Sequence, residues 1–228
     1  MTKEHAHTIT IIGNIGSGKT TTLPFVAKAL EADVIQADNL FQTTNPFRDR
    51  YLDDFKRWGF TNELWMAYHR KGLIASAVEQ SDKENIVIDS GMIMSWVYTK
   101  SHFLAGNLDK DEWALFNDLF TQWSRFSLKT TLLYLTAPLD VLMKRIKERG
   151  RDYELEMYTS SYLEQLEIGL TDLTANFAGV FDAIVTIDYT EIGDLRTKNA
   201  QGDFMKLAQK KFAYTRSAVE EQNPLLNS

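Results

Sequence analysis

Short apolar runs alternate with longer amphipathic segments along the whole chain. The apolar runs are rich in β-branched residues, which is typical of buried strands. The longer segments carry apolar residues three and four positions apart, the period of a helix. The apolar runs are residues 8–12, 33–37, 85–89, 130–136 and 183–188. This alternation predicts an α/β fold, one three-layer domain over residues 1–228 with a five-stranded parallel sheet flanked by helices.

The expected helices fill the segments between these strands. We expect a break or bend near Gly59, and a loop over residues 39–50, where an Asn-Pro pair occurs. We also expect residues 220–228 to be frayed. The expected helices are 19–31, 51–76, the first part of 91–107, 111–126, 139–148, 158–178 and 202–220.

Composition narrows the class of protein. A net charge of −6 argues against a mainly electrostatic binder of nucleic-acid polymers. The chain has no cysteine, which excludes disulfides and thiolate zinc sites. It starts without an apolar signal segment and has no run long enough to span a membrane, so we expect a cytoplasmic enzyme. The aromatic stripe of helix 111–126, which runs from Trp113 to Ser127, predicts core packing or a subunit interface, and hence a homodimer.

The stretch after the first strand carries the most specific motif. Gly13, Gly18, Lys19 and Thr20 match the phosphate-binding loop (P-loop) pattern of P-loop NTPases. Glycines let backbone N–H groups turn inward, and the following helix directs its positive dipole end at the same anion. Lys19 can reach the β- and γ-phosphates of ATP, and the Thr20 hydroxyl can ligate Mg²⁺. The expected nucleotide-binding residues are Gly13, Asn14, Ile15, Gly16, Ser17, Gly18, Lys19, Thr20 and Thr21.

Acidic residues follow two of the other expected strands. Asp38 is a candidate general base or ligand, and Asp89 is a candidate Mg²⁺ ligand, because ligands gather outside the carboxyl ends of parallel strands. Both residues could instead be caps of a helix, strand or turn. Glu63 and Arg70 share one helix face and could point into a cleft, although spacing alone favours a solvated, salt-bridged face.

A dense basic group follows the helix at 139–148. Arg145, Arg149 and Arg151 could neutralise charge on a transferred phosphoryl group, as part of a lid over about 145–158. They could also compensate the dipole of a helix end. The presence of the P-loop in the same chain favours the interpretation of these arginines as part of a lid.

Several of these segments resemble the deoxynucleoside kinases. The similar stretches are the P-loop, residues 45–47, residues 57–61 with Glu63 and Arg70, the lid motif over 144–154, and residues 187–194. The resemblance implies that Asp38 accepts the 5′-hydroxyl proton and that Tyr51 and Glu154 hold the sugar 3′-hydroxyl. It also implies that Arg145, Arg149 and Arg151 clamp the phosphates and that Asp194 lies in the adenine-binding loop.

The chain departs from the family pattern at a few positions. Ser90 stands where the family has an Arg that helps hold the 5′ region, and Ser95 where several members have an Asp that helps select the base. Asp38 replaces a Glu, and Glu63 replaces a Gln that pairs with the base edge. An ionised Glu only accepts hydrogen bonds and so matches the paired donors of guanine, which predicts a preference for deoxyguanosine.

Three functions remain open from the sequence. The first is an ATP- and Mg²⁺-dependent kinase of nucleotide salvage that phosphorylates the 5′-hydroxyl of a small-molecule deoxynucleoside. The second is a nucleoside monophosphate kinase, whose extra phosphate could be bound by Arg48, Arg50, Lys56 and Arg57. The third is a nucleotide-binding regulatory subunit with little catalysis, which Ser90 favours.

Overall fold

The computed structural model describes residues 7–37, 39–124, 130–176 and 181–222, and the side chains among them except those of 124, 152 and 214–222. Within these ranges, none of the helices combines the length and the apolar character that crossing a bilayer requires. Asp38, Ser127 and residues 223–228, which carry predictions made above, lie outside the described residues.

The centre of the molecule is a five-stranded sheet in the order β2-β3-β1-β4-β5. Every neighbouring pair is parallel, with Ile11 beside Asp89 on β3 and Gly13 beside Leu135 on β4. The order places the strand that leads into the P-loop in the middle, with its carboxyl end at a topological switch point. The strands are β1 (His7–Gly13), β2 (Asp33–Ile35), β3 (Asn85–Asp89), β4 (Thr130–Thr136) and β5 (Ala183–Asp188).

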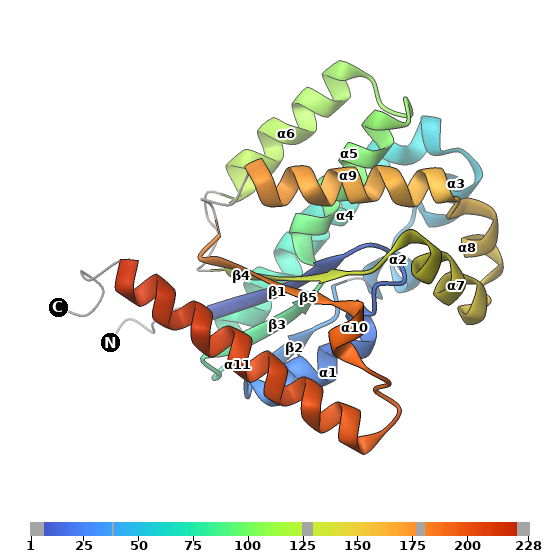
Figure 1. Ribbon diagram of the computed structural model, residues 1–228. Helices are drawn as coiled ribbons and strands as arrows, with labels where there is room; N and C mark the ends of the chain where they lie inside the picture. The colour runs from blue at the N-terminus through green and yellow to red at the C-terminus, as the bar shows by residue number, and fades with distance from the viewer. Residues whose placement is uncertain (1–6, 38, 125–129, 177–180, 223–228) are drawn as a thin grey trace.

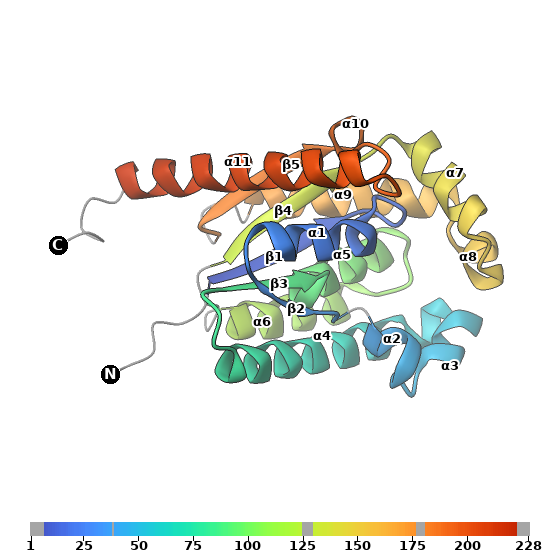
Figure 2. The ribbon, with the colours of Figure 1, turned by 90° about the horizontal axis from the view of Figure 1, so that it is seen from below.

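Helices cover both faces of this sheet, as Figures 1 and 2 show. On one face lie α1 (Lys19–Ala29), α10 (Tyr189–Ile192) and α11 (Lys198–Gln222). On the other face lie α4 (Phe55–Gln80), α5 (Gly91–Leu104), α6 (Lys110–Ser124) and α9 (Ser160–Asn176). Four further helices gather at the end of the sheet that carries the P-loop (Figures 1 and 2): α2 (Asn39–Thr43), α3 (Arg48–Asp53), α7 (Leu139–Arg149) and α8 (Asp152–Met157).

The alternating direction of the side chains along each strand explains the three layers. Ile9 and Ile11 pack in the cluster that contains α1 and α11, whereas Ile12 packs in the cluster that contains α4, α5 and α9. Successive side chains of a strand point to opposite faces, so each strand contributes to two cores. Both cores are buried and apolar, which confirms the predicted three-layer architecture with five parallel strands.

Two predictions about the segment after β2 are wrong. Residues 39–50 form α2, a turn and the start of α3. The turn between the two helices is closed by a hydrogen bond from the Phe47 N–H to Asn45 Oδ1 and by backbone hydrogen bonds of both residues. Helix α4 also continues through Gly59 without a break. A Cβ atom at Gly59 would lie 3.3 Å from Leu108 Cδ1 and 3.7 Å from the His102 ring. The glycine therefore allows close packing instead of a bend.

Candidate active site

A cleft of about 710 Å³ opens at the carboxyl ends of the strands. Its walls come from the P-loop, from α2 to α5, from the α7–α8 segment and α9, and from the turn after α10. Ligands of open α/β sheets bind at this edge. Among the described residues, every one predicted to bind the nucleotide, the phosphates or the nucleoside lines this cleft, apart from Gly13 and Asn14.

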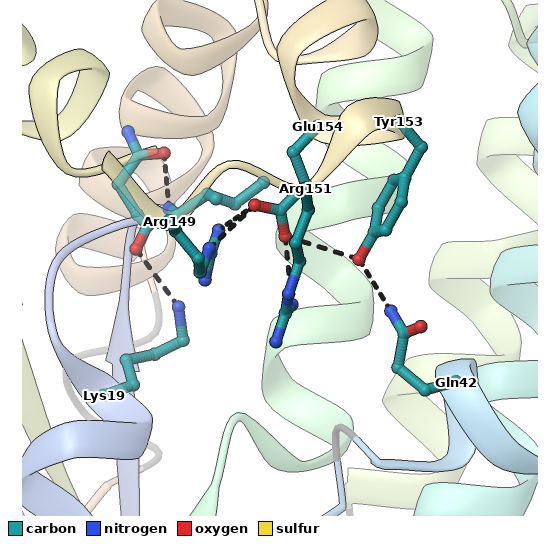
Figure 3. Close-up of polar contacts among 8 residues, drawn as sticks. Lys19, Gln42, Arg149, Arg151, Tyr153 and Glu154 are labelled. Atoms are coloured by element: carbon teal, nitrogen blue, oxygen red, sulfur yellow. Dashed lines mark hydrogen bonds and ion pairs between the residues drawn. The ribbon is translucent and has the colours of Figure 1, made fainter. Parts of the chain in front are cut away.

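The P-loop has the backbone shape that the motif requires. Gly13 has φ of 149°, and a Cβ atom there would lie 2.5 Å from the Leu135 carbonyl oxygen and 2.7 Å from Ser17 Oγ. Gly18 precedes α1 with φ of 104°. Lys19 Nζ donates to the carbonyl oxygens of Gly13 (3.0 Å) and Asn14 (3.1 Å), so its charge is held inside the loop. Figure 3 shows the Lys19 side chain with a hydrogen bond from its nitrogen.

Asn14 ties the P-loop to α9. Its side-chain amide donates to the Leu163 carbonyl (2.8 Å) and to Glu167 Oε2 (3.1 Å), and its Oδ1 accepts from the Ile15 N–H (2.9 Å). The other oxygen of Glu167 accepts from the Tyr134 hydroxyl on β4. Asn14 therefore lies behind the loop, and its side chain supports the loop's shape instead of facing the cleft.

Thr20 and Asp89 lie together at the base of the cleft. The Thr20 hydroxyl donates to Asp89 Oδ2 (2.9 Å), and Ser90 Oγ donates to Asp89 Oδ1 (3.2 Å). Hydroxyl and carboxylate oxygens are ligands that suit Mg²⁺, which keeps several waters and needs only one or two protein carboxylates beside nucleotide phosphates. Among the described side chains, no group of three or more His, Asp or Glu residues could hold a metal ion by itself.

Ser90, in the position where the resembled family has Arg, is fully buried. Its φ of 66° is a conformation that non-glycine residues rarely adopt. It caps α5 through its backbone, and its side chain contacts Asp89. Ser90 is therefore not among the residues that line the cleft. The described cations that do so are Lys19, Arg70, Arg145, Arg149, Arg151 and Arg196.

The basic lid segment converges on one buried carboxylate. Arg149 contacts Glu154 Oε2 through Nε (2.7 Å) and Nη2 (2.6 Å), and Arg151 Nη1 lies 3.1 Å from Glu154 Oε1. Figure 3 shows both guanidinium groups beside Glu154. Tyr153 donates to the same carboxylate and accepts from Gln42 Nε2 (2.8 Å), which joins the lid segment to α2 across the cleft.

Arg145 has a different place from the other two lid arginines. Its Nη1 donates to the Gly16 carbonyl (3.1 Å) and lies 3.3 Å from the Ser17 carbonyl. Its guanidinium also lies over the Tyr189 ring, 5.9 Å from the centroid. All three arginines of this segment line the cleft, and Arg145 contacts the P-loop directly.

Glu63 and Arg70 are buried and line the inner part of the cleft, so the alternative of a solvated, salt-bridged face is wrong. Asn62 Nδ2 donates to Glu63 Oε1 (2.8 Å), while Asn62 Oδ1 accepts from Asn45 (2.7 Å). Arg70 Nη1 donates to Ser95 Oγ (2.7 Å). The cleft therefore holds an acidic and a basic side chain, each oriented by a neutral neighbour.

Tyr51 lines the cleft with its ring packed against Phe55 and His102. Its hydroxyl lies 2.8 Å from His102 Nε2. Burial raises the pKa of Tyr51 well above its usual value, and the neighbouring Tyr162 and Glu63 raise it further. Burial also lowers the pKa of His102 to about 4. Both groups are therefore neutral near pH 7.

Sequence reasoning missed several residues that line the cleft. Tyr98 of α5, Tyr158 of the loop before α9 and Tyr162 of α9 contribute aromatic surface. At the outer edge, Arg196 pairs with Asp194 (2.8 Å). The tyrosines carry no spacing signal, because two helices and a loop contribute them. The basic Arg196, two positions after Asp194, is a signal that the sequence does offer. Asp38, the predicted base, lies outside the described residues.

A P-loop on the central strand of a parallel sheet, beside a lid rich in arginine, defines a P-loop kinase, a nucleotide-dependent phosphotransferase. The model of the deoxynucleoside kinase family matches residues 9–213. The chain belongs to the deoxynucleoside kinase family, and it is a kinase that acts on deoxynucleosides.

Individual relatives agree with this assignment. Deoxyadenosine/deoxycytidine kinase of Bacillus subtilis is 26% identical over 167 residues, covering 69% of this chain and 72% of that protein. Deoxyguanosine kinase of the same organism is 27% identical over 160 residues, covering 69% and 73%. The structure of deoxyadenosine kinase from M. mycoides with bound dATP has a TM-score of 0.71 at 21% identity, covering 89% of this chain and 98% of that one, a likeness of fold.

Proposed function

We propose that this chain transfers the γ-phosphoryl group of ATP to the 5′-hydroxyl of a deoxynucleoside, with the two substrates meeting in the cleft between the P-loop and α4. The observation that carries the proposal is the arrangement of one cleft with a P-loop at one side and a buried polar pair, Glu63 and Arg70, at the other. The cleft is large enough for two small ligands, because its volume is about 710 Å³.

The P-loop side suits a nucleotide bound with Mg²⁺. Backbone N–H groups of the loop face the phosphates, and Lys19 exchanges its carbonyl partners for phosphate oxygens. Thr20 and Asp89 are the residues that would hold the metal, whose charge offsets that of the phosphates. Asp194 and Arg196 at the outer edge would lie beside the adenine.

The α4 side suits the nucleoside. Glu63 and Arg70 would contact the base edge, and Tyr51 and Glu154 the sugar hydroxyl. Asp38 follows β2 and α2 begins at Asn39, so the 5′-hydroxyl would lie near that strand end for Asp38 to accept its proton. The protein does little covalent chemistry in this scheme and acts by positioning and charge stabilisation.

The lid segment over about 145–158 would complete the site when both substrates are bound. Glu154 holds Arg149 and Arg151 in the structure, and a sugar hydroxyl that binds Glu154 competes with them for its oxygens. The arginines then become available to the phosphoryl group, where they stabilise the transition state. Arg145, which already contacts the loop, fixes the base of the lid.

The two other functions have weaker support. The basic residues that an acceptor phosphate would need, Arg48, Arg50, Lys56 and Arg57, are absent from the described lining of the cleft. Arg50 and Arg57 lie over the Trp58 ring instead. The cleft is also lined by Lys19, Thr20, Asp89 and the three lid arginines, which does not favour a purely regulatory subunit. A cytoplasmic enzyme of nucleotide salvage fits this activity.

A phosphoryl-transfer screen tests the proposal. The purified chain is given ATP and Mg²⁺ with each deoxynucleoside, each ribonucleoside and each monophosphate, and the products are separated by liquid chromatography. We expect the wild-type protein to form deoxynucleoside 5′-monophosphates. We expect the Lys19→Ala variant to form none when the two samples contain the same amount of folded protein. Phosphorylation of monophosphates alone, or ATP binding without transfer to any nucleoside, would overturn it.

We also propose that the chain forms a homodimer through α4 and α6. An apolar groove of about 410 Å³ lies between these helices, lined mainly by Leu64, Trp65, Tyr68, Leu119 and Trp123. Tyr68 is 62% exposed and belongs to this groove, and contiguous exposed apolar surface marks interaction sites. Sedimentation velocity should give the dimer mass, and Tyr68→Glu should give the monomer. A wild-type monomer at micromolar concentration would refute the dimer.

A further inference from the structure

His102 is a fully buried histidine whose two ring nitrogens both have partners. Nε2 lies 2.8 Å from the Tyr51 hydroxyl, and Nδ1 lies 3.2 Å from the side-chain nitrogen of Asn107. The rings of Tyr51, Phe55 and Tyr162 surround it. His102 itself is not among the residues that line the cleft, so it can act on a ligand only through Tyr51.

The partner of Nδ1 determines where the ring carries its proton. An amide nitrogen only donates, so Nδ1 must accept from Asn107 and carry no proton. Burial keeps the imidazole neutral, with its pKa lowered to about 4. A neutral imidazole has one N–H group, which is therefore on Nε2 and donates to the Tyr51 oxygen. The hydroxyl proton of Tyr51 is left to point elsewhere.

The Tyr51 oxygen accepts from His102, so the hydroxyl keeps its own proton to donate elsewhere. Tyr51 lines the cleft together with Tyr158 and Tyr162. A ligand hydroxyl that binds beside Tyr51 in the cleft therefore receives the Tyr51 proton.

We propose that His102 and Asn107 are positioning residues that make Tyr51 a hydrogen-bond donor to a sugar hydroxyl of the nucleoside. This inference rests on the proposed function, in which Tyr51 contacts the sugar. Without the Nε2 proton, the Tyr51 hydroxyl would rotate to donate to the histidine and would present only its oxygen to the ligand. The tautomer of one buried ring thereby selects a ligand hydroxyl that accepts.

The tautomer is measured directly by long-range ¹H–¹⁵N correlation spectra of the unliganded protein. The chain has four histidines, and the signal lost in His102→Gln identifies the ring. We expect His102 to be neutral with its proton on Nε2 throughout pH 6 to 8. A proton on Nδ1, or a charged ring, would overturn the proposal. This readout does not depend on activity, so it separates failure of the inference from failure of the proposed function.

The effect on the substrate is measured with a deoxynucleoside and its 3′-deoxy counterpart. Loss of one neutral hydrogen bond corresponds to about a three- to tenfold change. We expect His102→Leu to raise KM for the deoxynucleoside by that factor, with kcat little changed, and to leave KM for the 3′-deoxy compound unchanged. His102→Gln, whose amide can replace the Nε2–H donor, should restore the difference. An equal rise for both compounds would indicate a merely structural role.

Two further variants keep the test decisive. Asn107→Ala frees the tautomer without changing the ring cage, so it should give a smaller rise of the same kind even if His102→Leu fails to fold. In the Tyr51→Phe background, His102→Leu should cause no additional change in the ratio of the two KM values, because the donor is already absent. Additive effects in this double-mutant cycle would contradict an action through Tyr51.

Discussion

Replacement of Glu63 by glutamine should change which base the enzyme prefers. Asn62 Nδ2 donates to Glu63 Oε1, and Asn62 cannot reverse its amide because its Oδ1 accepts from Asn45. A glutamine at position 63 would therefore turn its oxygen to Asn62 and its NH₂ group to the cleft. The variant presents a donor where the wild-type carboxylate presents an acceptor.

The size of the effect follows from the burial of this position. Guanine presents two adjacent donors, its ring N–H and its amino group, while its O6 can accept from Arg70. A buried donor facing a donor costs about 1–3 kcal/mol, which is about tenfold to a hundredfold in kcat/KM. Glu63 is only 4% exposed, so water does not relieve the mismatch. Adenine and cytosine place an acceptor beside their amino group and gain from the exchange.

The assay compares kcat/KM for deoxyguanosine, deoxyadenosine and deoxycytidine in both proteins. We expect wild-type enzyme to prefer deoxyguanosine and Glu63→Gln to shift the preference toward the other two by about tenfold or more. Glu164→Gln removes the same charge from an exposed position of α9 and serves as the control. Unchanged ratios between the three nucleosides in Glu63→Gln would refute the reasoning, because Glu63 would then not contact the base.

Three other perturbations test the remaining parts of the site. Lys19→Ala should reduce kcat/KM by about a hundredfold or more with the fold retained, whereas Lys28→Ala on the exposed side of the same helix should have no effect. Arg149→Ala and Arg151→Ala should lower kcat more than they raise KM for the nucleoside in steady-state kinetics; unchanged kcat in both would reassign the lid to helix-end compensation. The pKa of His102 is about 4 in the folded state, against 6.5 for an unperturbed histidine. Between these two pH values the unfolded state binds more protons than the folded state. The free energy of unfolding should therefore fall by about 3 kcal/mol as the pH drops from 6.5 to 4. Urea titrations at different pH values measure this pH dependence, and His102→Gln should remove it. An unchanged pH dependence in the variant would contradict its assignment to His102.

The sequence predicted the parts of the fold that depend on local pattern. Apolar runs identified all five strands, and the P-loop identified the edge of the sheet where the cleft lies. Residues 39–50 were predicted wrongly because Asn45 and Pro46 are typical of loops, yet the Asn45 side chain closes a turn between two short helices. The continuity of α4 at Gly59 depends on Leu108, which is remote in sequence.

The site was predicted less completely than the fold. Spacing put Glu63 and Arg70 on one face of a helix but could not distinguish a cleft from solvent, since burial depends on what packs opposite. The link from Asn14 to Glu167 joins residues 153 positions apart, and His102 meets Tyr51 across 51 positions. Such contacts exist only after the sheet and helices have assembled, so no local pattern encodes them.

The attachment of the P-loop to α9 has a consequence for how each substrate changes the affinity for the other. Helix α9 receives the Asn14 amide at Leu163 and Glu167, and one residue before Leu163 it carries Tyr162 into the nucleoside side of the cleft. A phosphate group that moves the P-loop also moves Tyr162. We therefore expect nucleotide and nucleoside to change each other's Kd by the same factor, since thermodynamic linkage is reciprocal. Calorimetry with a non-hydrolysable ATP analogue measures this factor, and in Glu167→Ala it should fall toward one.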